Sequence, residues 1–380
     1  MPLNLQACCV WGLLVLAGSG LATAPAAAPP LPPIRHVFIV MLENQSYETT
    51  FAANSATPYL ARTLAAKGAL LTHYFGVGHY SLDNYLALLS GQAPNDETQQ
   101  DCLVFSEFRA TAGPDANGQL PGSGCVYPPS VRALPDQLEA AGLTWKAYME
   151  DMGNNPAREA PTCGHVPVGA AETTDAAQIG DQYAAKHNPF VYFHSIIDDQ
   201  GRCDAHVVNL TQLPQDLGSA ATTPNYVFIT PNLCHDGHDD PCVDGRHGGL
   251  RAVNEFLREW VPRIQKSAAF RADGMLLITF DEAGTLGQVG SMACCGPQPL
   301  PGARFPPGLN GPGGGRIGAL VLSRFVKAGT VSSVPYNHYS TLRTVEAIFG
   351  MEPLGYAAAP DTRAFGSDVF SAAVPRPPVR

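Results

Sequence analysis

Six short runs of apolar residues recur along this chain and alternate with segments of helical periodicity, and this alternation constrains the fold more than any other feature. The runs occupy residues 36–42, 69–77, 144–149, 225–230, 274–280 and 317–322. Each has the length of one strand and is apolar enough to be buried on both faces, as in parallel sheets. We therefore expect an α/β fold, with helices on both sides of a mostly parallel central sheet.

Four segments between these runs carry helical patterns. Residues 58–67 are expected to form a helix with Pro58 in its first turn and Gly68 just beyond its end. Residues 82–90 and 340–349 show the same periodicity, and residues 249–266 form a longer pattern that Pro262 is expected to interrupt. The long loop at 284–315 contains CCGPQPLPG and GPGGG, and we expect an ordered excursion or the rim of a site.

The N-terminal residues predict an export signal. Residues 7–24 are apolar and end in small residues, and no charged side chain precedes Arg35. This pattern indicates a secretory signal peptide over residues 1–22, followed by a stiff Pro/Ala-rich spacer over residues 23–33. An uncleaved anchor is the alternative, although the run barely reaches the length needed to span a bilayer. We expect a secreted or periplasmic protein without stable membrane insertion after cleavage, and one domain over residues 34–380.

Cysteine usage agrees with export. The chain has ten cysteines, and the eight outside the predicted signal suggest up to four disulfides. Sequence order favours Cys102–Cys125, Cys163–Cys203 and Cys234–Cys242. Eight cysteines permit 105 connectivities, and the adjacent Cys294 and Cys295 cannot be assigned from sequence. A zinc site built on cysteines is disfavoured because no CxxC pair occurs.

The charge balance limits the partners that the chain can bind. A formal net charge of −10 argues against binding nucleic acid or an anionic membrane surface. A site for a phosphorylated small molecule or lipid headgroup must then obtain positive charge locally, from metal ions or from a few His, Lys and Arg side chains.

Polar side chains gather directly after three of the predicted strands. Glu43-Asn44 follows the first run, the segment 232–239 follows the fourth, and Asp281-Glu282 follows the fifth. The carboxyl ends of parallel strands form the ligand crevice of an open sheet, so these groups are expected to share one site. Adjacent acids at such a position usually require a cation. A helix cap after Glu43 and a solvated turn at Asp281 are the structural alternatives.

The segment GHYSLDNYLALLSG (78–91) contains the candidate nucleophile. Ser81 is expected at the start of a helix that follows a strand, where backbone N–H groups and the helix dipole favour an anionic oxygen. A neighbouring cation would lower the pKa of the hydroxyl and activate it without a histidine base. Taken alone, Ser81 is better explained as a plain helix N-cap.

Six segments, in order along the chain, resemble the motifs of the bacterial phosphoesterase family. They are LENQSYETTF (42–51), HYSLDNYLALLSG (79–91), KHNPFVYF (186–193), TPNLCHDGHD (230–239), LLITFDEAG (276–284) and NHYSTLRTVEAIFGM (337–351). This family includes phospholipases C and secreted acid phosphatases, and the likeness is greatest to short secreted acid phosphatases of the mycobacterial type. The resemblance implies an alkaline-phosphatase-like α/β/α sandwich.

The resemblance also implies roles for individual residues. Ser81 would be the phosphorylated nucleophile, and Asn84 would donate to a phosphate oxygen. The activating divalent cation (Mg, Mn, Ca, Fe or Zn) would be held by Ser81 together with Glu43, Asn44, Asp281 and Glu282. Further groups would complete the phosphate pocket or a second metal site, and one histidine would protonate the leaving oxygen. These groups are Asn232, Asp236, His238, His338 and the catalytic His187.

Two positions depart from the family pattern. Asp83 stands where the family usually has proline before the Asn of the nucleophile motif, and this adds a negative charge close to an anionic substrate. His235 replaces a more usual Asn, which could alter metal occupancy or the response to pH.

Several functions are compatible with this scaffold. We favour a metal-dependent phosphomonoesterase that forms a phosphoserine, acting on phosphoinositides or other organic phosphates. A phospholipase C-type phosphodiesterase is the main alternative, although the chain ends soon after the last motif while larger members carry C-terminal β modules. A sulfatase is disfavoured because its motif requires Pro and Arg where Asp83 and Tyr85 stand. A secreted binding protein on a degenerate phosphatase scaffold is the non-enzymatic alternative.

Overall fold

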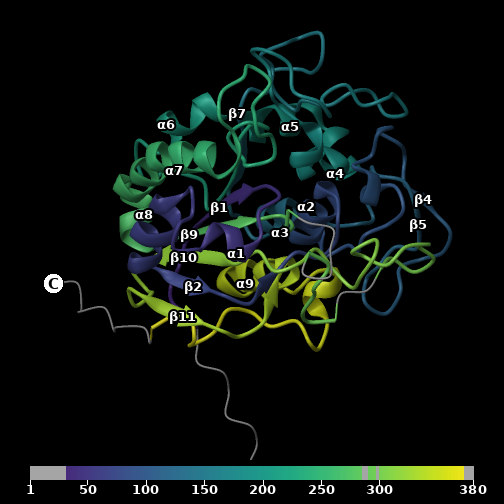
Figure 1. Cartoon of the computed structure of the whole chain (residues 1–380). Helices are drawn as coiled ribbons and strands as arrows, with labels where there is room; N and C mark the ends of the chain where they lie inside the picture. The colour runs from purple at the N-terminus through teal and green to yellow at the C-terminus, as the bar shows by residue number, and fades with distance from the viewer. Residues whose placement is uncertain (1–30, 285–289, 297–298, 372–380) are drawn as a thin grey trace, which may run out of the picture.

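A single eight-stranded sheet forms the centre of the protein (Figure 1). The computed structural model describes residues 31–284, 290–296 and 299–371. The strands lie side by side in the order β11-β2-β10-β9-β1-β8-β6-β7. Their bounds are β1 (His36–Leu42), β2 (Ala69–Leu71), β6 (Trp145–Met149), β7 (Val207–Asn209), β8 (Tyr226–Thr230), β9 (Gly274–Phe280), β10 (Ala319–Ser323) and β11 (Thr330–Ser332).

Every pairing in this sheet is parallel except the two that involve β10, which runs antiparallel to β9 and β2. The central strand β1 pairs with β9 along its whole length, from His36 opposite Gly274 to Leu42 opposite Phe280. All residues of β1, β8 and β9 are buried, as expected for strands covered on both faces. The predicted α/β fold with a mostly parallel sheet is confirmed.

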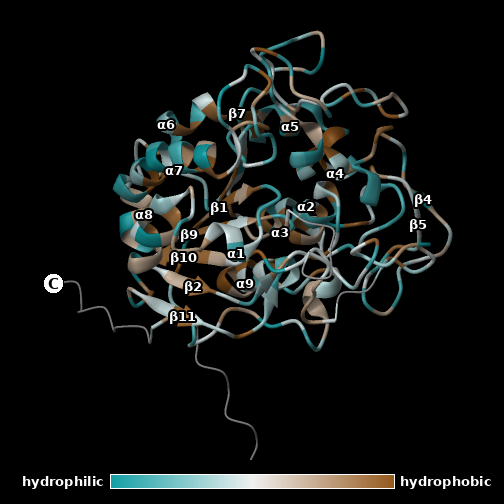
Figure 2. Ribbon diagram, viewed as in Figure 1, coloured by the Kyte–Doolittle hydropathy of each residue, from teal (hydrophilic) through white to brown (hydrophobic). Residues whose placement is uncertain are grey.

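Helices pack on both sides of the sheet. In Figure 1, α7 and α8 lie on one side and α2 and α9 on the other. Figure 2 shows hydrophobic strands between them and hydrophilic residues along the outer side of α7 and α8. The α-helices are α1 (Tyr47–Thr50), α2 (Ser81–Ser90), α3 (Leu134–Ala140), α4 (His194–Ile197), α5 (Gln200–His206), α6 (Leu213–Asp216), α7 (Gly249–Lys266), α8 (Ala268–Asp273) and α9 (His338–Phe349).

Short elements complete the described part of the chain. Strand β3 (Tyr74–Phe75) pairs in parallel with β12 (Tyr336–Asn337), and β4 (Arg109–Ala110) pairs with β5 (Gly122–Ser123). The remaining elements are single turns of non-α helix: η1 (Tyr59–Leu64), η2 (Ala65–Lys67), η3 (Thr98–Gln100), η4 (Ala185–His187), η5 (Pro189–Tyr192), η6 (Leu210–Gln212) and η7 (Gly355–Ala358).

The predicted strands are confirmed with one change. The run at 69–77 is not one strand but two, because β2 joins the main sheet whereas β3 turns away to pair with β12. The helix expected over 58–67 has the predicted extent, but it is wound as the π-helical turn η1 and the 3-10 turn η2. The helices at 82–90 and 340–349 are present as α2 and α9.

The expected interruption at Pro262 was wrong, since α7 continues from Gly249 to Lys266 with Pro262 inside it. A proline removes one helical hydrogen bond, here to the carbonyl of the exposed Arg258, which water can satisfy. The flanking Val261 and Ile264 are buried against the core, and this packing outweighs the loss of one bond.

The predicted disulfides are confirmed: Cys102–Cys125, Cys163–Cys203 and Cys234–Cys242 are bonded. The unassigned cysteines, Cys294 and Cys295, are bonded to each other. Within the described ranges, no helix is both long and apolar enough to cross a membrane. The predicted signal at 1–22 and most of the predicted spacer lie outside the described residues.

Candidate active site

The three polar clusters meet because their strands are neighbours. Strands β9, β1 and β8 are adjacent and parallel, so their carboxyl ends lie at one edge of the sheet. Backbone bonds continue past the strand ends: Glu43 N–H donates to the carbonyl of Asp236 at 2.9 Å, and Asp281 N–H donates to that of Leu42 at 2.8 Å. The sheet therefore fixes the spacing of these acidic residues.

Ser81 begins helix α2 and faces this edge. Its hydroxyl donates to Glu43 Oε2 at 2.8 Å, and Tyr85, one turn further along the helix, donates to Glu43 Oε1 at 2.5 Å. Both oxygens of Glu43 are thus bonded to residues of α2. Only 2% of Ser81 is exposed, so a reacting group must enter a confined pocket to reach it.

The turn before Ser81 is strained and braced. Tyr80 has φ +69° and ψ +152°, a backbone conformation that residues other than glycine rarely adopt. The Asn84 amide spans this turn, since its oxygen accepts from Val77 N–H at 2.7 Å and its nitrogen donates to the Tyr80 carbonyl at 3.1 Å. Both ends of the Asn84 amide thus bond the backbone, and its contact with a phosphate oxygen stays a prediction. Asn84 is fully buried and holds the turn that presents Ser81.

A glycine-rich segment abuts this turn from the 284–315 loop. Gly314 N–H donates to the carbonyl of Gly76, and a Cβ on Gly314 would lie 2.2 Å from the carbonyl oxygen of Gly78. Only glycine permits so close an approach. The described part of the loop thus contacts the turn before Ser81, as expected for the rim of a site.

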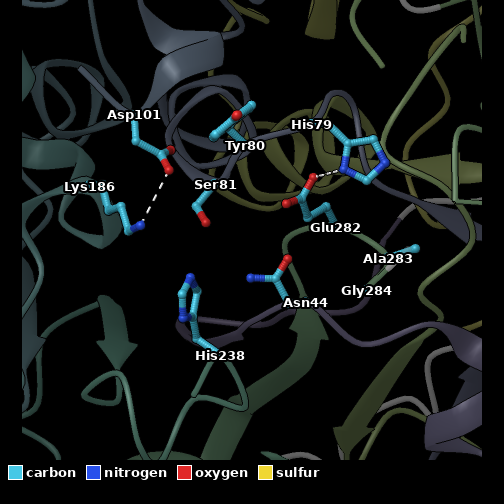
Figure 3. Close-up of a pocket in the computed structure, with 10 residues that line it drawn as sticks. All are labelled: Asn44, His79, Tyr80, Ser81, Asp101, Lys186, His238, Glu282, Ala283 and Gly284. Carbon is cyan, nitrogen blue, oxygen red and sulfur yellow. Dashed lines mark hydrogen bonds and ion pairs between the residues drawn. The ribbon is translucent and has the colours of Figure 1, made fainter. Parts of the chain in front are cut away.

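A pocket of about 310 Å³ opens in front of Ser81 (Figure 3). Figure 3 shows Lys186 and Asp101 on one side of Ser81, and Asn44, His79 and Glu282 on the other. The residues that line it are Asn44, His79, Tyr80, Ser81, Asp101, Lys186, His238, Glu282, Ala283 and Gly284. The structure therefore brings Asn44, Ser81, His238 and Glu282 of the predicted set to one pocket.

The acidic residues beneath the pocket repel one another. Burial, followed by the charges of Asp281 and Asp236, raises the pKa of Glu43 well above its ordinary value. Burial likewise raises the pKa of Asp281, and burial with the charge of Asp281 raises that of Glu282. Asp281 accepts from Asn44 N–H through Oδ1 at 2.9 Å, while its Oδ2 has no hydrogen-bond partner among the described residues. Buried acids this close together are stable only when they are protonated or when a cation lies beside them.

His187 lies within this acidic cluster. Its Nε2 is 3.4 Å from Glu43 Oε2 and its Nδ1 is 3.2 Å from Asp236 Oδ2, and the ring stacks on Tyr85. Only 1% of His187 is exposed, and burial, with the charge of Lys186, lowers its pKa well below the ordinary value. His187 is thus a buried neutral ring behind Ser81, while the pocket itself is lined by other residues.

Two further predicted residues serve the scaffold instead of the pocket. His338 is fully buried at the start of α9, where Nε2 lies 2.7 Å from the Asp281 carbonyl and Nδ1 lies 3.2 Å from the Tyr74 hydroxyl. Burial lowers its pKa to about 4, so it is neutral at ordinary pH. The Asn232 side chain donates to Asp151 at 2.8 Å and accepts from His235 N–H, which organises its own loop. Neither residue lines the pocket, and their part in a phosphate pocket or a second metal site stays a prediction.

His238 is the histidine of the predicted set that lines the pocket. Its Nδ1 lies 2.7 Å from Asp239 Oδ1, and this contact directs the other ring nitrogen away from the carboxylate. The side chain is 29% exposed, so His238 can exchange protons with a ligand or with water. This arrangement suits a general acid or base.

Four of the pocket residues with polar side chains have no predicted role: His79, Tyr80, Asp101 and Lys186. His79 pairs with Glu282 through Nδ1, and its Nε2 lies 2.5 Å from the carbonyl of Gly290. Lys186 stands next to His187 in the motif at 186–193. Its charge could have indicated a role in the site, because a phosphate site in so acidic a chain needs cations. Asp101 lies in a loop without any pattern that predicts a site.

Asp101 also changes the expectation for the helix terminus. Its Oδ1 accepts from Leu82 N–H at 3.0 Å, so the backbone donor next to Ser81 is already bonded. The N-terminus of α2 was expected to offer such groups to a phosphate. In the structure, Asp101 occupies this donor and Lys186 stands beside Asp101.

The predicted metal ligands have side chains of the kind that bind divalent cations. Among the described residues, no group of three or more His, Cys, Asp and Glu side chains is arranged to hold a metal ion as it stands. The predicted ligands, however, include the Asn44 amide and the Ser81 hydroxyl, and Asp281 Oδ2 is an unbonded buried carboxylate oxygen. Oxygen ligands of this kind suit hard cations.

Comparison with known proteins shows which family the chain belongs to. Residues 51–352 match the Phosphoesterase family. The chain belongs to the phosphoesterase family. The predicted enzyme class, a phosphoric ester hydrolase, is confirmed at the level of this family.

Individual relatives agree with this membership. An acid phosphatase of Aspergillus fumigatus is 26% identical over 89% of this chain and 61% of its own length. A phosphatidylinositol-3-phosphatase of Mycobacterium tuberculosis is 26% identical over 93% of this chain and 92% of its own length. The chain spans only about 60% of the fungal relative. Among solved structures, a protein of the alkaline phosphatase superfamily from Vibrio parahaemolyticus matches 92% of this chain and 77% of its own, with a TM-score of 0.53 and 11% identity. This likeness confirms the predicted alkaline-phosphatase-like fold.

Proposed function

We propose that the protein is a secreted, metal-dependent phosphomonoesterase that acts through a phosphoserine on Ser81. The observation that carries this proposal is the Ser81 hydroxyl, which lies 2.8 Å from Glu43 at the head of α2 and faces the pocket. Its setting among buried carboxylates with raised pKa values is unfavourable unless a cation belongs there.

Glu43, Asn44, Ser81, Asp281 and Glu282 would hold the divalent cation. When bound, such a cation neutralises phosphate charge and favours the ionised serine hydroxyl. The mainly oxygen ligands favour a hard ion such as Mg²⁺, Mn²⁺ or Ca²⁺, and Fe or Zn remain compatible with this set.

The chain's own residues supply the remaining chemistry. Ser81 Oγ attacks phosphorus in line with the leaving oxygen, and its proton passes to Glu43 Oε2. His238, oriented by Asp239, gives a proton to the leaving oxygen as the bond from phosphorus to that oxygen breaks. In the second step His238 takes a proton from water, which attacks the phosphoserine, and Ser81 recovers its proton as phosphate departs.

The relatives suggest the class of substrate. The names acid phosphatase and phosphatidylinositol-3-phosphatase both describe hydrolysis of phosphate monoesters. We propose an organic phosphate monoester, with phosphoinositide headgroups among the candidates. Export is supported by the four disulfides, because such bonds persist in oxidising compartments.

Replacement of the nucleophile tests the proposal. We expect Ser81→Ala to lower kcat on p-nitrophenyl phosphate by at least roughly 10⁴-fold, with little change in the thermal unfolding temperature. Acid quenching of the wild-type protein during turnover, followed by peptide mass spectrometry, should find the phosphoryl group on Ser81. Full activity of the variant, or phosphate on another residue, would exclude Ser81 as the nucleophile.

A further inference from the structure

The pocket contains one side chain whose charge is opposite to that of its surroundings. Of the described residues that line the pocket, Lys186 is the only Lys or Arg. It lies at the far side of Ser81 from Asn44 and Glu282, as Figure 3 shows. The carboxylate cluster therefore lies on one side of Ser81, and the only ammonium of the described pocket lining lies on the other side, beside Asp101.

Contacts hold Lys186 in this position. Its Nζ lies 3.3 Å from Asp101 Oδ2 and 3.0 Å from Asp175 Oδ1, and only 7% of the side chain is exposed. Burial alone would lower the pKa of Lys186, but the charges of Asp101 and Asp175 outweigh burial and raise it above the ordinary value. Lys186 is thus a fixed positive charge at every pH of interest.

This ammonium can still bind another anion. An ammonium group has three hydrogens, and the two aspartate contacts use two of them. The 3.3 Å contact with Asp101 is longer than a strong charge-assisted bond, so it can yield to a better acceptor. The neighbouring Leu82 N–H is already bonded to Asp101, which leaves Lys186 as the better placed donor on this side.

We propose that Lys186 binds a phosphoryl oxygen on the side away from the metal ligands, and that this contact selects phosphate monoesters over diesters. The inference rests on the proposed function and deepens it. A monoester places three unesterified oxygens around phosphorus and carries up to two negative charges. A diester has one negative charge, and a second ester group takes the place of the third oxygen. Asp101 acts as the positioning residue for Lys186.

A pair of substrates with the same leaving group isolates this selectivity. The wild-type protein and Lys186→Met are assayed for kcat/KM on p-nitrophenyl phosphate and on bis(p-nitrophenyl) phosphate. We expect the variant to lose roughly 10- to 100-fold on the monoester, as for one lost hydrogen bond to a charged group, and less than about 3-fold on the diester. Calorimetric titration with orthophosphate should show a loss of affinity similar to the monoester effect.

Matched variants control for indirect effects. Lys146→Met removes a lysine that also pairs with an aspartate, Asp216 at 2.9 Å, but lies outside the pocket lining, and it should leave both activities unchanged. Lys186→Arg retains the charge and should retain most of the monoester preference. If Lys186→Met does not fold, the double variant Lys186→Met/Asp101→Asn is assayed in its place, because it also removes the carboxylate that Lys186→Met leaves unpaired.

The outcomes separate this inference from the proposed function. Equal losses on both substrates, or no change in their ratio, would overturn the role of Lys186 while leaving a phosphomonoesterase in place. Absence of hydrolysis by the wild-type protein and by Lys146→Met would overturn the proposed function. The orthophosphate titration would then decide whether Lys186 binds phosphate at all.

Discussion

The two sides of Ser81 are built in different ways. On one side, Glu43 and Asp281 directly follow β1 and β9, and the sheet fixes where they lie. On the other side, Asp101 comes from a loop and Lys186 from the short turn η4 (Ala185–His187), so their positions depend on tertiary contacts. The sheet side collects the buried carboxylates that are proposed to bind a cation, whereas the loop side carries the Lys186 ammonium beside Asp101. We expect the sheet side to set the rate of chemistry and the loop side to set the choice of substrate.

The largest effect should come from the sheet side. Asp281→Asn keeps the bond from Asn44 N–H, since the amide oxygen can accept it, but removes a charge that the proposed cation would need. We expect kcat on a phosphate monoester to fall by about 10³-fold, with no change in preference over a diester. In chelator, the unfolding temperature of the variant should equal or exceed that of the wild type, because the variant lacks a buried carboxylate that its neighbours repel. A changed monoester preference would show that the sheet side also affects the choice of substrate.

Removal of divalent cations should make the stability of the protein sensitive to pH. Burial, with neighbouring carboxylates for two of them, raises the folded-state pKa of Glu43, Asp281 and Glu282 above the unfolded values. Their contribution to stability is therefore complete below a pH of about 4 and is lost as pH rises through the raised values. In chelator, the unfolding temperature should be lower at about pH 7.5 than at about pH 5.

Added cation provides the control for this effect. Excess Mn²⁺ should restore the unfolding temperature mainly at the higher pH, where the carboxylates are charged. Other buried acids keep their own dependence on pH, such as Glu346, whose pKa burial raises to about 8, so some slope should remain. Equal effects of Mn²⁺ at both pH values would show that these carboxylates do not bind the ion.

A smaller effect is expected at Asp101. Asp101→Asn can still accept from Leu82 N–H, but it no longer attracts the Lys186 ammonium. We expect KM for a phosphate monoester to rise about 3- to 10-fold, less than for loss of Lys186 itself, with kcat nearly unchanged. A large fall in kcat instead would place Asp101 in the chemistry of the reaction.

The smallest effect on activity should come from the disulfide beside Asp101. Removal of Cys102–Cys125 by alanine substitution should destabilise the fold by about 2–4 kcal/mol and raise KM about 2-fold, because Asp101 becomes less well held. Removal of Cys163–Cys203 should destabilise the fold similarly and leave KM unchanged. Calorimetry and steady-state kinetics on both variants test this difference, and equal KM values would show that the disulfide does not position Asp101.

The difference between the sheet side and the loop side of Ser81 also explains what could be predicted from sequence. Glu43 and Asp281 were predictable because apolar runs mark the strands and the carboxyl ends of parallel strands must converge. The part played by Asp101 depends on a loop that passes near α2 only in the folded chain, and no local pattern encodes that approach. The observed contacts of Asn84 and His338 could not be predicted for a related reason. Residue type indicated a polar contact, but only packing decides whether its partner is backbone or ligand.

The separation of the site residues along the chain has a consequence for how activity is acquired. Asn44 and Asp281 are bonded across 237 positions of sequence, so the site cannot form until β1 and β9 have paired. Long-range parallel pairing is a late and slow event in folding. A partly synthesised or partly folded chain therefore lacks the proposed active site. The rate at which activity returns during refolding would therefore report when β1 and β9 pair.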